Sequence, residues 1–218
     1  MTPKKNSLKD KAYDVIKQKI TSCKFKPNDF INEKDLIEEL HVSRTPIREA
    51  LSRLEQEHLV TILPKRGVIV TDVSMKDVIE IYNVRELIEP YLVENYGKNI
   101  DKDELIKLKV LLETRDKTDS DSHYSIDEAL HRLLVYSSNN QYFISVMDHI
   151  DSQNQRIRIL SGEQVEKRLE RTSREHLEIL NYLISEDWHS AVKAMKFHLK
   201  NSKKTAIDLW YKKTISSR

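Results

Sequence analysis

Glycine and cysteine are scarce in this sequence, and their scarcity excludes several classes of site. The 218 residues include only three glycines and one cysteine, Cys23. Glycine-rich phosphate loops and turn-rich all-β folds need backbone conformations that glycine tolerates best. A lone thiol forms neither an internal disulfide nor a cysteine zinc cluster. No apolar run approaches the roughly 18 residues of a membrane-spanning helix, and no signal peptide is evident. We therefore expect a cytoplasmic protein with no membrane partner.

The sequence also has almost no excess of charge of either sign, because its formal net charge is only +2. This value alone does not indicate a nucleic-acid partner. Its distribution is more informative, since residues 1–73 are net basic and residues 74–218 are slightly acidic. The length suits two domains, and the asymmetry favours a DNA-facing N-terminal part. We predict one domain over 1–73 and a second over 74–218.

The first domain is predicted to be a winged helix-turn-helix. Helical periodicity of apolar residues predicts helices over 7–22, 33–40 and 45–57. Only the short turn HVS separates the last two. Two β-rich runs, LVTIL and GVIVT, flank Pro64, Lys65 and Arg66, and Gly67 closes their turn. Two helices joined by a short turn and followed by a basic hairpin are typical of this DNA-binding fold.

The start of the third helix has the side chains best suited to base recognition. That end of a recognition helix enters the major groove, and an arginine can bond two acceptors of a guanine at once. Hydroxyl groups there can cap the helix or donate to phosphate, as can basic side chains of the preceding helix and the wing. The alternative for the arginines is a solvated face with surface salt bridges. The candidate DNA-binding residues are Lys34, Ser43, Arg44, Thr45, Arg48, Lys65 and Arg66.

The segments PNDFINEKDLIEELHVSRTPIREALSRLEQEHLV and PKRGVIV closely resemble the DNA-binding domain of the GntR regulators. That family usually has glycine at three positions that hold Asn28, His41 and His58 in this sequence. Asparagine accepts a left-handed backbone well and histidine less often, so these departures concern local turns. By position, the resemblance implies DNA contacts at Lys34, Ser43, Arg44, Thr45, Arg48 and Gly67.

The second domain is predicted to be a six-helix antiparallel bundle, so the whole chain is mainly α. Its helical pattern predicts helices over 74–96, 101–116, 122–137, 140–161, 163–185 and 187–212. His131, His176 and His198 lie on apolar stripes, and Asp127 shares a helix face with His131. Buried polar rings need partners, and a divalent metal would satisfy this set. The alternative is a set of histidines satisfied within an apolar core.

The stretches IDEALHRLLVYSSNNQYF and EHLEILNYLISEDWHSAVKAMKFHL look like the two signatures of the FCD ligand-binding domain. This domain is the C-terminal half of the FadR-type GntR regulators, and the chain length suits the VanR-like subgroup. The resemblance implies a divalent metal (Zn, Ni or Mn) bound by Asp127, His131, His176 and His198.

The segment VRELIEPYLVE resembles the first helix of the FCD domain and suggests where an effector binds. An inward-facing Arg85 can hold a carboxylate through two parallel hydrogen bonds. The alternative for Arg85 is a salt bridge with Glu86 or Glu89. Asn154 and Arg158, on the helix predicted over 140–161, are further effector-binding candidates.

Together the resemblances imply a transcription regulator rather than an enzyme. A homodimer would bind a palindromic operator, and repression relieved by a ligand is the family's commoner habit. A small organic acid in the helical domain would change operator affinity through the short junction between the domains. Two alternatives stay open: a metal-dependent enzyme that uses the three histidines and the aspartate, and a regulator that senses an acyl thioester.

Overall fold

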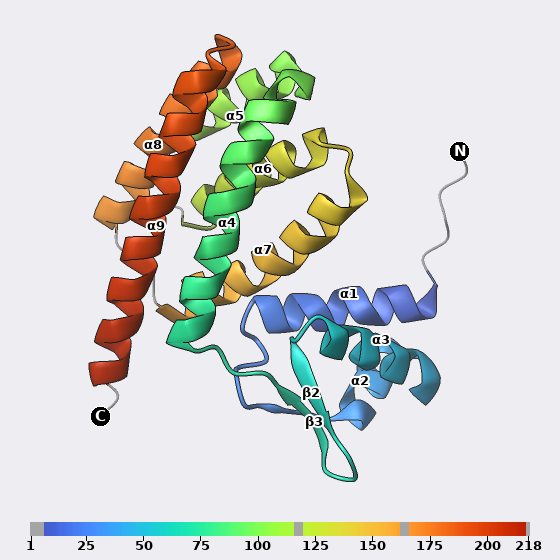
Figure 1. Cartoon of the computed structure of the whole chain (residues 1–218). Coiled ribbons are helices and arrows are strands. Elements are labelled where there is room, and N and C mark those ends of the chain that lie inside the picture. The colour runs from blue at the N-terminus through green and yellow to red at the C-terminus, as the bar shows by residue number, and fades with distance from the viewer. Residues whose placement is uncertain (1–6, 116–119, 162–165, 217–218) are drawn as a thin grey trace. The chain divides into compact units, whose positions relative to one another are not determined.

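The computed structural model divides into two compact units and is mostly helical (Figure 1). It describes residues 7–115, 120–161 and 166–216. The first unit contains the described residues up to Ser74 together with Gln155–Leu160, and the second contains the rest. The predicted mainly-α class is therefore confirmed. Within the described residues, no helix combines the length and the apolarity that crossing a membrane requires.

The first unit has the topology of a winged helix-turn-helix. Its elements are α1 (Leu8–Thr21), β1 (Phe30–Ile31), α2 (Glu33–Leu40), α3 (Arg44–Gln56), β2 (Val60–Leu63) and β3 (Gly67–Val70). The strands are antiparallel in the order β1-β3-β2, with Phe30 opposite Ile69 and Val60 opposite Val70. The predicted hairpin is confirmed. β1 was not predicted, because two residues are too few to show an alternating pattern.

Local signals explain where the helices of this unit begin. The Ser7 side chain accepts from the Asp10 backbone N–H while the Asp10 carboxylate accepts from Ser7, which is a capping box at the start of α1. At the start of α2, the Asn32 side chain accepts from the backbone N–H of Lys34. The inward faces of α1, α2 and α3 then close one core. Its fully or almost fully buried members include Ala12, Ile16, Ile20, Leu36, Ile47, Leu51 and Leu54.

In the described residues of the first unit, five residues other than glycine have a left-handed backbone, namely Cys23, Asn28, His41, His58 and Lys65, and three of them bear on the GntR pattern. The φ angles are 69° at Asn28, 53° at His41 and 55° at His58. These are the three positions at which the GntR pattern usually has glycine. His41 is the C-cap of α2, where glycine normally avoids the steric conflict of a Cβ atom. The chain therefore keeps the family's turn geometry in spite of the strain that a side chain adds.

Replacing His41 with glycine should stabilise the first unit. A left-handed residue with a Cβ costs roughly 1–2 kcal/mol, and the greater freedom of glycine in the unfolded chain offsets part of the gain. Because the His41 side chain is exposed, its removal loses little packing. We expect the free energy of unfolding to rise by ~0.5–1 kcal/mol, measured by urea denaturation. The control His41→Ala keeps the Cβ and should not stabilise; a lower urea midpoint for His41→Gly would contradict the argument.

The second unit is a bundle of helices. Its elements are α4 (Met75–Tyr96), the 3₁₀ turn η1 (Gly97–Asn99), α5 (Lys102–Thr114), α6 (Ser120–Ser137), α7 (Gln141–Ser161), α8 (Glu166–Ile184) and α9 (Trp188–Ser216). In the described residues, six α-helices follow one another as predicted. The predicted start of the fifth, at residue 163, lies outside the described residues. The last helix continues to Ser216, past its predicted end at residue 212, and η1 was not predicted.

Apolar faces bring these helices together around one core. α4 packs against α9 and α6, and α8 packs against α9 and α5; Figure 1 shows α4, α8 and α9 side by side. Buried side chains from these helices fill the core, including Val93, Leu105, Leu130, Leu134, Ile179, Leu180, Met195 and Leu199. Against this apolar background, buried charged and imidazole side chains stand out.

Candidate metal centre and DNA-binding surface

Four buried side chains from three helices converge inside the second unit. Asp127 and His131 lie one turn apart on α6, while His176 belongs to α8 and His198 to α9. All four residues are buried, and His176 is 0% exposed. Each offers one ligand atom, and these four atoms all lie within 4.8 Å of one another. The structure thus brings together the four side chains that were predicted to hold a metal.

The Nε2 atoms and one aspartate oxygen form the centre of this cluster. Asp127 Oδ1 lies 3.2 Å from His176 Nε2 and 3.7 Å from His131 Nε2. His176 Nε2 lies 3.3 Å from His198 Nε2. In the described part of the chain, His131 Nε2 makes no hydrogen bond. Three imidazole nitrogens and a carboxylate oxygen therefore meet within one buried region.

A buried carboxylate orients His131 from the side away from the cluster. His131 Nδ1 donates to Glu89 Oε2 at 2.5 Å, and the Arg85 Nε–H donates to Glu89 Oε1 at 2.6 Å. Arg85 and Glu89 are 3% and 0% exposed. A hydrogen bond at Nδ1 fixes the tautomer, so that Nε2 is the nitrogen that remains for a metal.

A second carboxylate orients His198 in the same way. His198 Nδ1 donates to Glu175 Oε2 at 2.9 Å, and the Asn201 amide donates to Glu175 Oε1 at 2.8 Å. Glu175 was not predicted as part of the site, and Glu89 was predicted only as a possible partner of Arg85. Metal-binding histidines commonly donate their other ring N–H to a carboxylate, so these two glutamates complete the pattern of a metal centre.

The pKa values of the cluster follow from burial and from these pairs. Burial alone would raise the pKa of Glu89, but the charges of Arg85 and His131 outweigh it and lower the pKa to about 2. Burial alone would lower the pKa of His131, but the Glu89 carboxylate raises it to about 9. Burial lowers the pKa of His198. A metal must therefore displace a proton from His131, as metal binding to histidine generally requires.

The donor set fits a divalent transition metal. Zinc sites in proteins use imidazole nitrogen and carboxylate oxygen, and three or four protein ligands are usual. Here the carboxylates of Glu89 and Glu175 accept the Nδ1 protons, while the Nε2 atoms and Asp127 Oδ1 face one another. Hard cations such as Mg²⁺ prefer oxygen ligands, so a set with three imidazoles favours Zn²⁺ or a similar ion.

The three predicted effector-binding residues have different surroundings. Arg85 makes the buried ion pair with Glu89, whereas Glu86 pairs with Lys203 Nζ at 2.7 Å. Asn154 is 5% exposed. Arg158 is grouped with the first unit, so its place beside the cluster stays a prediction. The sequence-based alternative of an ion pair between Arg85 and Glu89 is therefore present in the structure.

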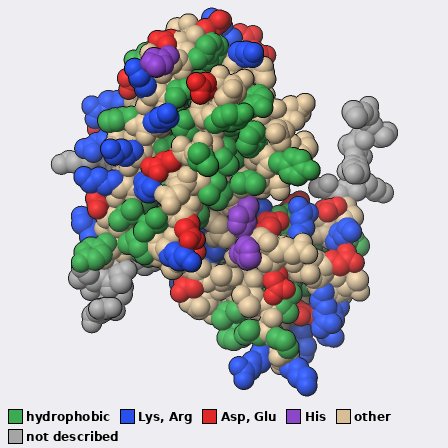
Figure 2. Space-filling model, in the orientation of Figure 1, with side chains coloured by type: hydrophobic (Ala, Val, Ile, Leu, Met, Phe, Trp, Pro, Cys, Tyr) green, Lys and Arg blue, Asp and Glu red, His purple; other side chains and the backbone are tan. Residues whose placement is uncertain are grey.

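The predicted DNA-binding residues are exposed along α2, α3 and the wing of the first unit. Figure 2 shows basic side chains gathered at the tip of the β2–β3 hairpin. Gly67 has a φ of 109°, a conformation that a residue with a Cβ adopts only under strain. The exposed residues are Lys34, Ser43, Arg44, Thr45, Arg48, Lys65, Arg66 and Gly67.

Two details of this surface differ from the sequence analysis. α3 begins at Arg44, one residue earlier than predicted, and Ser43 occupies the N-cap position without a side-chain capping bond. Arg48 Nε makes an exposed ion pair with Glu33 Oε2 at 3.1 Å. The salt-bridge alternative is thus present for Arg48, although a pair this exposed is weak enough to open.

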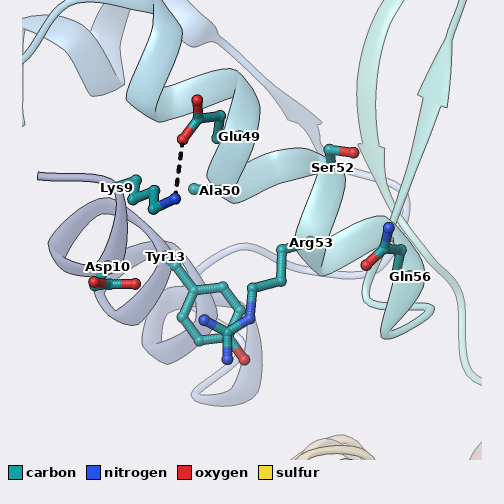
Figure 3. A pocket seen from close by; sticks show the side chains of 8 residues that line it. All are labelled: Lys9, Asp10, Tyr13, Glu49, Ala50, Ser52, Arg53 and Gln56. Carbon is teal, nitrogen blue, oxygen red and sulfur yellow. Dashed lines mark ion pairs between the residues drawn. The ribbon is translucent and has the colours of Figure 1, made fainter. Parts of the chain in front are cut away.

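Arg53 lines a groove between α1 and α3, where its side chain has a structural role. The groove has a volume of about 480 Å³ (Figure 3). There the Arg53 guanidinium stacks 3.7 Å above the Tyr13 ring and lies 3.6 Å from Glu57, while Lys9 pairs with Glu49. These contacts hold α1 against α3, and they leave Arg53 outside the set of base-reading candidates.

Two family descriptions match the chain. Residues 8–70 match "Bacterial regulatory proteins, gntR family", and residues 80–201 match "FCD domain". The first match contains α1–α3 and the wing, and the second contains all four residues of the buried cluster. Both resemblances inferred from the sequence are therefore confirmed.

Similar proteins support the same assignment. The HTH-type transcriptional regulator YdhC of Bacillus subtilis (strain 168) is 33% identical over 172 residues, which cover 77% of this chain and 76% of YdhC. The HTH-type transcriptional repressor RspR of Escherichia coli (strain K12) is 26% identical over 196 residues, or 88% of this chain and 86% of RspR. A solved Zn²⁺-bound FCD domain, from the transcriptional regulator TM0439, is 27% identical with a TM-score of 0.57 and covers 65% of this chain and 99% of that chain.

These names describe regulators, so the alternative of a metal-dependent enzyme is not supported. The geometry agrees with them, because an exposed helix-turn-helix in one unit accompanies a buried His/Asp cluster in the other. This chain belongs to the GntR family of bacterial transcription regulators and has the FCD type of C-terminal domain.

Proposed function

We propose that this chain is a cytoplasmic, homodimeric repressor whose affinity for a palindromic operator is controlled by a small carboxylate effector at a metal centre. One observation carries the proposal: the buried Nε2 atoms and the aspartate oxygen lie within 4.8 Å of one another, in a chain that also has a DNA-binding unit. RspR, a relative over 88% of this chain, is named a repressor. This supports repression as the sign of regulation.

The metal would be bound by Asp127, His131, His176 and His198, with zinc as the first ion to test. A Zn²⁺-bound FCD domain is known for TM0439, and the nitrogen-rich donor set here suits the same ion. When bound, the ion supplies a Lewis-acidic centre that can accept a carboxylate oxygen. Glu89 and Glu175 would hold two of the imidazoles in place from outside.

Arg85 is the best-placed candidate for a second contact with the effector carboxylate. Its ion pair with Glu89 uses Nε, and the planar guanidinium has further N–H groups at its Nη atoms, which suit a carboxylate. Asn154 and Arg158 remain candidates for other parts of the effector. A buried guanidinium beside a metal would select a small anion over a neutral ligand.

Dimerisation is part of the proposal because a palindrome is bound by two symmetric copies. On the second unit, Leu87 and Tyr142 are 76% and 86% exposed. The Tyr91 ring lies 5.8 Å from the Phe143 ring, which joins α4 to α7. Figure 2 shows hydrophobic side chains gathered over α4. Exposed apolar area of this kind is typical of a protein–protein contact.

The direct test is operator binding with and without candidate acids. Fluorescence anisotropy of the zinc-loaded protein on its own upstream DNA should show tighter binding than on a random duplex at every salt concentration. A cognate acid should weaken operator binding by roughly 5- to 150-fold, the range of typical allosteric coupling. Chelation of the metal should abolish the response to the acid. Equal binding to both duplexes would overturn the regulator proposal, and a chelation-resistant response would overturn the role of the metal.

The Glu175→Gln substitution tests the outer layer of the metal centre. It removes the charge that accepts the His198 Nδ1 proton, while keeping the size of the side chain. Loss of an outer-layer partner typically lowers metal affinity about 10- to 100-fold, so we expect that loss with stoichiometry unchanged, measured by competition with a zinc-binding dye. The matched control is Glu178→Gln, an exposed glutamate on the same helix. Equal zinc affinities for the two variants would contradict the assignment.

A further inference from the structure

A glutamate near the end of α3 is bonded to the first strand of the β2–β3 hairpin, the wing. The Ile62 backbone N–H donates to Glu55 Oε1 at 2.7 Å. Glu55 is half-buried, and Ile62 lies seven residues further along the chain. A side chain of the predicted recognition helix therefore holds the strand that leads to the tip of the wing.

The Ile62 N–H lies on the open side of the sheet. β2 is an edge strand, because the strand order is β1-β3-β2. Leu59 and Thr71 are bonded across the two strands, and bonded pairs alternate along an antiparallel ladder. The next bonded pair is then Thr61 with Ile69, so the N–H of Ile62 faces away from β3. Glu55 supplies the acceptor that an edge strand lacks.

The place of Glu55 in the helix does not by itself favour a carboxylate. Glu55 lies in the last turn of α3, which ends at Gln56. The C-terminal end of a helix has partial negative charge, so a cation such as Arg53 suits this turn better than an anion does. Helix stability therefore does not explain the charge of Glu55, whereas its bond to the wing gives it a role.

The wing is a lever whose tip has the basic side chains. Figure 1 shows the hairpin projecting beyond the helices of the first unit. Only residues 57–59 connect α3 to β2. Lys65 and Arg66 are exposed and follow Ile62 by three and four residues, a reach of roughly 10 Å along a strand. A small rotation of the hairpin against α3 would therefore displace both cations from a phosphate.

We propose that Glu55 is a positioning residue for DNA binding. It fixes the angle of the wing against α3, so that Lys65 and Arg66 reach the DNA while the start of α3 lies in the major groove. This inference rests on the proposed function, in which both wing residues contact the operator. Without the bond to Ile62 the wing adopts more orientations, and the apparent affinity falls with the fraction that is competent to bind.

A double-mutant cycle tests this role on the full-length chain, by fluorescence anisotropy with its own upstream DNA. Glu55→Leu removes the acceptor and should weaken operator binding about 5-fold per chain, the effect of about one hydrogen bond. The wing variant combines Lys65→Ala with Arg66→Ala and so has no basic tip to position. Adding Glu55→Leu to this variant should leave its affinity unchanged, whereas a merely structural loss would weaken both backgrounds equally.

Two further variants separate the hydrogen bond from the charge. Glu55→Gln keeps an oxygen that can accept from Ile62, so it should restore the affinity that Glu55→Leu loses. Glu49→Leu is the matched control, because Glu49 is an exposed glutamate of the same helix that pairs with Lys9. It removes the same charge, and it should not weaken operator binding. Circular dichroism and thermal melting check that each variant folds.

The outcomes separate this inference from the proposed function. Equal losses from Glu55→Leu in both backgrounds would overturn the inference, and so would a wing variant that binds the operator as the wild type does. In either case, tighter binding to the operator than to a random duplex would leave the regulator proposal standing. If the wild type binds both duplexes equally, the regulator proposal fails and the inference fails with it.

Discussion

His176→Ala should empty the metal centre and leave operator binding intact. The substitution removes a nitrogen that lies 3.2 Å from Asp127 Oδ1 and 3.3 Å from His198 Nε2. Losing an outer-layer partner costs about 10- to 100-fold in metal affinity, so losing a ligand should cost more than ~100-fold. After dialysis, elemental analysis should find about one zinc per wild-type chain and none in the variant. Operator binding should persist, because the DNA-binding residues belong to the other unit.

The control for this experiment is His189→Ala. His189 is also a histidine of the second unit, but it is exposed and lies outside the cluster. Zinc at about 100 times its Kd should stabilise the wild type and the control by ~2.7 kcal/mol, and it should leave the melting temperature of His176→Ala unchanged. Stoichiometric zinc retained by His176→Ala would remove His176 from the ligand set.

Arg48→Ala should weaken operator binding by about 1–3 kcal/mol and relax sequence specificity. Arg48 is exposed on the first turns of α3 and makes an ion pair with Glu33. On DNA this weak pair can exchange for a guanine edge, which an arginine binds through two hydrogen bonds. Competition between the operator and single-base variants would show the loss concentrated at one position of each half-site.

Arg53→Ala is the matched control, since Arg53 belongs to the same helix. Its guanidinium is stacked on Tyr13 in the groove between α1 and α3. The control should lower thermal stability and leave operator specificity unchanged. If Arg48→Ala binds the operator and its variants as the wild type does, Arg48 has no part in base recognition.

The ligand set could be predicted because its sequence signals are local. Asp127 and His131 are four residues apart on one helix, and each histidine interrupts an apolar stripe. The outer layer could not be predicted in the same way. His131 is 42 residues from Glu89 and His198 is 23 residues from Glu175. Such pairs exist only after the helices pack, so no periodicity within a single helix indicates them.

The partner of Arg85 shows how far helix geometry can resolve an alternative. Glu86 and Glu89 were both possible partners, but residues one position apart on a helix do not face each other, whereas residues four apart do. The structure pairs Arg85 with Glu89 and places Glu86 against Lys203 of α9. The first choice follows from spacing within α4, and the second depends on how α4 packs against α9.

The winged helix-turn-helix was predicted almost completely, and the exceptions are short. The three helices and the hairpin have clear periodicities, whereas β1 contains only Phe30 and Ile31 and has no period of its own. The left-handed turns at His41 and His58 could not be predicted from the residue type either, because histidine seldom adopts this conformation. The resemblance to the GntR pattern, which has glycine at both positions, is the signal that indicates these turns.

The Glu89 carboxylate accepts hydrogen bonds from both Arg85 and His131. Under the proposed function, metal binding and acid binding would therefore depend on each other. An acid bound at the Nη atoms of Arg85 would share the guanidinium charge with Glu89, and so would affect the group that orients a metal-binding imidazole. By thermodynamic reciprocity, the factor by which the acid changes metal affinity is also the factor by which the metal changes acid affinity. Under the proposed function, the zinc supply would set the threshold at which the regulator responds to its acid.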